Sequence, residues 1–97
     1  MKPLTYHPEA SDEIDEAYRW YAALSTGVAD GFFEELFPAL DRVHKRPRLY
    51  PPFLSGTQRV VLDRYPFSII DRELLHEIQI IAVAHAKRRP DYWANRL

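Results

Sequence analysis

The segment EIQIIAVAHAKRRPDYW, residues 77 to 93, is the most informative part of the sequence, because it starts as a strand and ends as a basic and aromatic segment. From Ile78 to Ala84 every residue except Gln79 is apolar, a pattern typical of a central strand that is covered on more than one side. After His85 come three cations and then two aromatic residues. A packed core does not require such an edge, so we expect function at this end of the sheet.

Upstream of this strand, the apolar pattern predicts two more strands and two helices. Short β-branched runs at 58–62 and 67–70, with a turn-like segment between them, predict two strands that pair antiparallel. Before them, apolar residues recur every three or four positions, which predicts two amphipathic helices. The first helix begins at Pro8, and its stripe consists of Ala10, Ile14, Ala17, Tyr18, Tyr21 and Leu24. The stripe of the second helix consists of Ala29, Phe32, Phe33, Leu36, Leu40 and Val43.

The connections between these elements set the expected architecture. Gly27 is expected to end the first helix in the left-handed conformation, and Pro47 to end the second. Because the segment between the two helices is so short, they must lie antiparallel as a hairpin. With a first strand at residues 2–6, the order is β-α-α-β-β-β. We therefore expect one domain, residues 1–97, of the α+β class, with a helical hairpin packed on one face of a small antiparallel sheet.

Composition and charge narrow the class of protein. Residues 1–41 hold two basic and nine acidic residues, a net charge of −7, whereas residues 42–97 hold eleven basic and five acidic, a net charge of +6. Opposed patches of this kind steer charged partners. The chain contains no cysteine, and neither its first residues nor any later segment has the apolar run of a signal peptide or a membrane span. We expect a soluble, cytoplasmic protein.

No metal or cofactor site is expected from the sequence. The four histidines fall in four separate elements, without the spacing of metal ligands. The carboxylates of the first helix lie opposite its apolar stripe and are interpreted as a solvated face; they are Glu9, Asp12, Glu13 and Glu16.

Several short motifs together give the chain a family resemblance. They are Tyr6-His7-Pro8-Glu9-Ala10, Phe33 and Leu36, Arg59, Tyr65-Pro66-Phe67, and Ala82-Val83-Ala84-His85 with Arg89-Pro90-Asp91-Tyr92-Trp93. In this order they resemble the RelE/ParE superfamily, the toxins of type II toxin–antitoxin modules, over essentially the whole chain. The resemblance implies a bacterial or archaeal protein that is held inactive by a cognate antitoxin in a hetero-oligomer.

The two branches of that superfamily imply different chemistry. RelE-like toxins cut messenger RNA on the ribosome without a metal, and Arg59, His85 and Tyr92 would then be the catalytic residues. However, Ala86 stands where those nucleases carry an arginine, and Pro51-Pro52-Phe53 where they carry lysines. The chain is also near neutral, whereas RNA affinity depends on phosphate contacts. These departures favour the ParE-like branch, whose members poison DNA gyrase.

In the ParE-like interpretation the protein acts by binding rather than by catalysis. The expected partner-binding residues are Arg59, Lys87, Arg88, Arg89, Tyr92 and Trp93. The resemblance leaves two alternatives open: a ribosome-dependent mRNA endonuclease, and a non-toxic domain of the same fold that only binds its antitoxin.

Each of these residues also has an ordinary structural interpretation. Arg59 and the three cations at 87–89 can be solvated charges, and His85 can cap a strand end. Tyr92 and Trp93 can pack back on the sheet. Because residues 87–93 follow the last core strand, we expect them to contribute few buried contacts and to be removable without loss of the fold.

Overall fold

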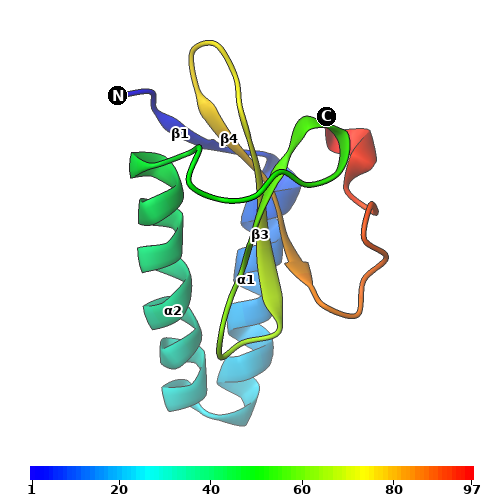
Figure 1. Cartoon of the computed structure of the whole chain (residues 1–97). Helices are drawn as coiled ribbons and strands as arrows, with labels where there is room; N and C mark the ends of the chain where they lie inside the picture. Colours follow the sequence, from blue (N-terminus) through cyan, green and yellow to red (C-terminus); the bar gives the residue numbers. More distant parts are fainter.

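The computed structural model describes all residues from Met1 to Leu97 and has the predicted element order (Figure 1). The strands are β1 (Leu4–Tyr6), β2 (Gln58–Val61), β3 (Phe67–Glu73) and β4 (Ile78–His85), and the helices are α1 (Pro8–Leu24) and α2 (Thr26–Lys45). Two short 3-10 turns, Leu54–Gly56 and Ala94–Arg96, complete the chain. Neither α-helix contains an apolar run that could span a lipid bilayer.

The sheet has the strand order β1-β4-β3-β2, so β4 is central, as its apolar sequence predicted. β4 pairs antiparallel with β3, and β3 antiparallel with β2, but β1 pairs parallel with β4. The sheet is therefore mixed, and the expectation of a wholly antiparallel sheet was wrong for β1. A hairpin turn fixes the direction of consecutive strands, whereas β1 is separated from β4 by both helices and two strands.

The helical hairpin forms as predicted, apart from the detail of its turn and from Leu24, which belongs to the predicted stripe but is 66% exposed. Pro8 occupies the first turn of α1, and the His7 Nδ1 atom accepts a hydrogen bond from the backbone N–H of Glu9 at 3.1 Å. A single residue, Ser25, with extended backbone, ends α1 and begins α2. Gly27 lies inside α2, so its predicted role as a left-handed helix end was wrong. α2 ends at Lys45, shortly before Pro47, as expected.

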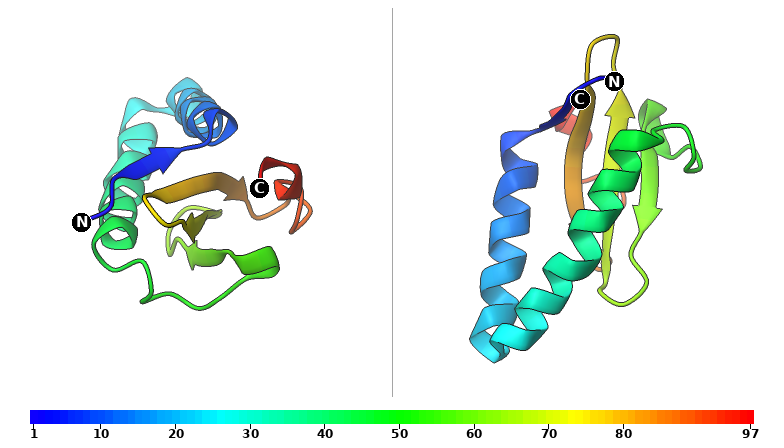
Figure 2. Two further views of the ribbon diagram at one scale, coloured as in Figure 1. Left: turned by 90° about the horizontal axis from the view of Figure 1, so that it is seen from above. Right: turned by 90° about the vertical axis from the view of Figure 1, so that its left-hand side faces the viewer.

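The sheet is covered on both faces. The hairpin packs on one face over the main core, in which Phe32, Leu36 and Ile80 are fully buried. On the other face a smaller cluster joins Ile70, Ile81 and Ala82 to Trp93 of the C-terminal segment. Figure 2 shows the hairpin and this segment on opposite sides of the sheet. The last residues of the chain are therefore part of the folded structure.

Candidate functional site

The C-terminal end of β4 extends past the residues that pair with β1. β1 pairs only with Ile78–Ile80, so on the edge of β4 away from β3 the second half of the strand has α1 and the C-terminal segment beside it. Two hollows flank this end of β4, and both are lined by His85 and Arg88. We call the hollow against α1, of about 320 Å³ and lined also by Trp20, Tyr21, Phe67 and Tyr92, the α1 pocket. The hollow on the helix-free side, of about 90 Å³ and lined also by Phe53, Arg59, Ala84, Arg89 and Pro90, is the arginine groove.

Two arginines of this site are held by aromatic rings and have no acidic partner. The Arg59 guanidinium lies 4.2 Å from the centre of the Phe53 ring, and that of Arg88 lies 3.9 Å from the centre of the Tyr92 ring. Neither arginine is in an ion pair of the structure. Stacking fixes the plane of a guanidinium and leaves its N–H groups free, so both side chains are placed to bind an anion.

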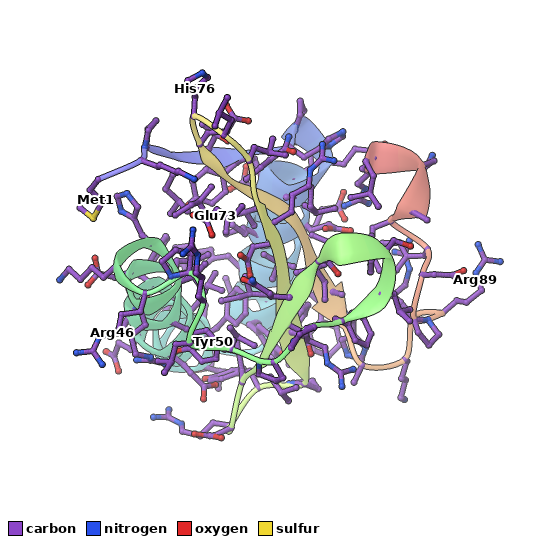
Figure 3. The ribbon with its side chains drawn as sticks, turned by 45° about the horizontal axis from the view of Figure 1, so that its top comes forward. Met1, Arg46, Tyr50, Glu73, His76 and Arg89 are labelled. Carbon is purple, nitrogen blue, oxygen red and sulfur yellow. The ribbon has the colours of Figure 1, made fainter.

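The remaining cations of the segment differ in their surroundings. Arg89 pairs with Asp91 at 3.1 Å and projects from the loop after β4, as Figure 3 shows. Lys87 is exposed and lines neither hollow. Its backbone N–H donates to the His85 Nδ1 atom at 3.0 Å, so a neutral His85 carries its proton on Nε2. The His85 ring also meets the Phe67 ring edge to face, with 5.1 Å between the ring centres.

Tyr92 faces α1 rather than the arginine groove. Its hydroxyl donates to the Glu13 Oε2 atom at 2.6 Å, and the pKa of Tyr92 is raised well above its ordinary value by burial and by this carboxylate. Of the three nuclease candidates, Arg59 and His85 thus line the arginine groove, whereas the Tyr92 hydroxyl is engaged elsewhere. The structure does not bring the three functional groups to one point.

Sequence reasoning missed the contact that holds this segment to α1. Arg96 binds Glu13 with two hydrogen bonds of 2.9 Å each, and also donates to the carbonyl of Ile81. The Glu13 carboxylate accepts in addition from the backbone N–H of Val83 at 3.1 Å. With side-chain exposures of 8% for Arg96 and 13% for Glu13, this is a nearly buried ion pair.

The expectation that Glu13 is a solvated carboxylate was therefore wrong. A signal was present, because Glu13 lies three residues after Ala10 and four before Ala17, which places it beside the buried stripe. Nothing in the sequence near Arg96 marks it as the partner.

Trp93 is buried in the core and contacts the site only from beneath, where it lines the arginine groove. Its side chain is 0% exposed, and its ring centre lies 6.2 Å from that of Phe53. The Arg59 guanidinium is stacked on this same Phe53 ring. The expectation that the tail contributes few buried contacts was wrong. A large apolar ring gains more from covering the open face of the sheet than from exposure to water. As a predicted partner-binding residue, Trp93 can act only by supporting Phe53 and the groove.

Comparison with known proteins identifies the family and the fold of the chain. Residues 4–90 match the family model described as the ParE toxin of the type II toxin–antitoxin system parDE. A solved structure titled "Chromosomal ParDE TA system from P. aeruginosa" is similar in fold, with a TM-score of 0.78 and 22% sequence identity over 90% of this chain and 98% of the other. No curated protein sequence matches the chain. Since the family model spans most of the chain, the protein belongs to the ParE toxin family of type II toxin–antitoxin systems.

Proposed function

We propose that this ParE-family toxin inhibits DNA gyrase in the cytoplasm by binding to it, and that a cognate antitoxin neutralises it in a toxin–antitoxin hetero-oligomer. The observation that carries the proposal is that Arg59 and Arg88, which have no acidic partner, are each stacked on an aromatic ring beside the C-terminal end of β4. Arginine and aromatic residues dominate the energetics of protein interfaces, and a guanidinium that is already oriented loses little entropy on binding.

Binding is better supported than RNA cleavage. A metal-free ribonuclease needs groups that move protons at the 2′-oxygen and the leaving oxygen, and cations at the phosphate between them. Here the Tyr92 hydroxyl is 2.6 Å from the Glu13 carboxylate, and Ala86 supplies no cation. Arg59 and His85 do share the arginine groove, which keeps the ribosome-dependent endonuclease as the second candidate.

The proposal of a cognate antitoxin rests on family membership. The similar structure from P. aeruginosa is itself titled as a ParDE system. The third possibility, a domain that binds an antitoxin but is not toxic, differs from our proposal only in activity. The assay for gyrase inhibition therefore also tests this possibility.

The test is inhibition of gyrase supercoiling by the purified protein. The wild-type chain is compared with the double variant Arg59→Ala/Arg88→Ala and with Arg46→Ala, which removes an exposed arginine at the opposite side of the molecule (Figure 3). We expect the double variant to require at least about tenfold more protein for half inhibition, the equivalent of about 1.4 kcal/mol. The Arg46→Ala control should match the wild type.

Thermal unfolding of each variant shows whether a loss of inhibition reflects a loss of fold. A wild-type protein that leaves supercoiling unaffected contradicts the proposal. Inhibition that survives unchanged in the folded double variant would place the active surface elsewhere.

A further inference from the structure

The α1 pocket and the arginine groove share two lining residues, and this continuity suggests a single site. We infer that together they bind one acidic segment of a partner protein, with a bulky apolar side chain of that segment in the α1 pocket and a carboxylate in the arginine groove. The inference deepens the proposed function, because it assigns a partner chemistry to the same end of β4.

The α1 pocket has the size and lining for an apolar anchor. Its volume of about 320 Å³ lies at the lower end of the range of ligand pockets, and its walls include Ala17, Tyr21, Phe67 and Val83. At its rim stands Trp20, which is 65% exposed and meets Tyr21 edge to face at 5.3 Å between ring centres. An exposed tryptophan beside an open, partly apolar pocket is typical of the anchor point of an interface.

The arginine groove has the size and charge for a carboxylate. At about 90 Å³ it admits a small group but no large ring. Arg59 enters it from β2 and Arg88 from the loop after β4, and both offer N–H groups that no acidic side chain of this chain occupies. A guanidinium can bind a carboxylate through two parallel hydrogen bonds, which adds direction as well as energy.

The position of the two hollows limits the occupant to a short segment. His85 and Arg88 line both, and Arg88 stands between them on the ring of Tyr92. A peptide therefore reaches both hollows with residues that are close together in its sequence.

Charge favours a peptide over a nucleic acid. Glu13 and Glu16 both line the α1 pocket, and the charge of Glu13 is paired with that of Arg96. A nucleic acid carries a phosphate at every nucleotide and would bring one against Glu16. A peptide can instead place its apolar residue beside Glu16 and its carboxylate beside Arg59, which also predicts its orientation across the site.

The test begins with selection of binders from a random library of 12-residue peptides on the full-length wild-type protein. The inference predicts that selected peptides carry an aspartate or glutamate within a few residues of a leucine or an aromatic residue. A selected set without acidic residues, or one rich in lysine and arginine, would overturn it.

Fluorescence anisotropy of a labelled selected peptide then locates the site. Trp20→Ala and Arg59→Gln should each weaken binding at least tenfold, whereas the control Arg46→Gln should leave the affinity unchanged. Trp20 and Arg46 are exposed, and circular dichroism confirms that each variant is folded. Unchanged affinity in both site variants refutes the assignment. A single-stranded DNA oligonucleotide that displaces the peptide at a lower concentration than unlabelled peptide assigns the site to nucleic acid and also refutes it.

The outcomes separate this inference from the proposed function. Acidic peptides that bind as described to a protein without effect on gyrase leave the inference standing and contradict gyrase inhibition. Conversely, gyrase inhibition by a protein whose Trp20→Ala variant keeps full peptide affinity contradicts the two-part site alone.

Discussion

A buried carboxyl group on β3 predicts that the stability of this protein falls between pH 5 and pH 8. The side chain of Asp71 is 0% exposed, and neither of its oxygens has a hydrogen-bond partner. It faces Gln58 of β2 and Ile80 of β4 across the sheet. Burial, with a smaller contribution from the charge of Glu73, raises the pKa of Asp71 from 3.8 to about 7.

The size of the effect follows from linkage between protonation and folding. Because the pKa of Asp71 rises from 3.8 to about 7 on folding, protonation of Asp71 adds about 4 kcal/mol to the free energy of unfolding. Between these two pKa values the folded protein keeps the proton that the unfolded chain has lost. The contribution of this proton to the free energy of unfolding is therefore complete below about pH 4 and is lost as the pH rises through 7. About 2–3 kcal/mol of it should disappear between pH 5 and pH 8.

The assay is urea-induced unfolding, followed by circular dichroism, at pH 5 and pH 8. Asp71→Asn keeps the shape of the side chain but cannot ionise, so the free energy of unfolding of this variant should fall by about 2–3 kcal/mol less than that of the wild type. The four histidines are common to both proteins and cancel in the comparison. Asp12→Asn, at an exposed position on α1, is the matched control and should behave as the wild type. An equal pH dependence in wild type and Asp71→Asn would show that Asp71 does not cause the loss of stability.

Three further predictions concern the contacts around the site. Trp93→Ala should lower the free energy of unfolding by about 3–5 kcal/mol, because the ring is fully buried. Truncation after Ala86 removes this ring with the rest of the segment and should leave no cooperative thermal transition. A truncated chain with the wild-type melting temperature would contradict this prediction. Glu35→Ala removes the acceptor of the backbone N–H groups of residues 63–65, at 2.8–3.2 Å, and should cost about 2 kcal/mol and speed amide exchange in that turn; unchanged exchange would count against it. Tyr92→Phe should lower stability by about 1–2 kcal/mol, through loss of the bond to Glu13, but keep gyrase inhibition; a folded variant without inhibition would show that the hydroxyl acts directly.

Much of the fold could be predicted from local sequence patterns. The apolar stripes located both helices, and Ala10, Ile14, Phe32 and Leu36 are buried as expected. The run from Ile78 identified the central strand, because a strand covered on both faces shows no polar alternation. These features depend on residues that are close in sequence, where the period of the apolar pattern is decisive.

The parts that could not be predicted depend on contacts between distant residues. The parallel pairing of β1 with β4 and the ion pair of Glu13 with Arg96 join opposite ends of the chain, and neither has a local signal. Trp93 was placed wrongly for the same reason: the sequence of a basic and aromatic segment does not show whether its rings are exposed to water or packed on the sheet. The stacking of Arg59 on Phe53 is likewise a tertiary contact that adds detail to a residue already selected.

Trapped gyrase–DNA cleavage complexes report directly whether this ParE-family toxin acts on gyrase through Arg59 and Arg88. Purified toxin is incubated with gyrase, supercoiled plasmid and ATP, the reaction is stopped with detergent and protease, and the linear DNA is quantified. We predict that wild-type protein and Arg46→Ala raise the linear fraction alike, whereas folded Arg59→Ala/Arg88→Ala does not. No linear DNA with wild-type toxin, together with cuts in messenger RNA on translating ribosomes that disappear in Arg59→Ala, would contradict the account and establish the endonuclease.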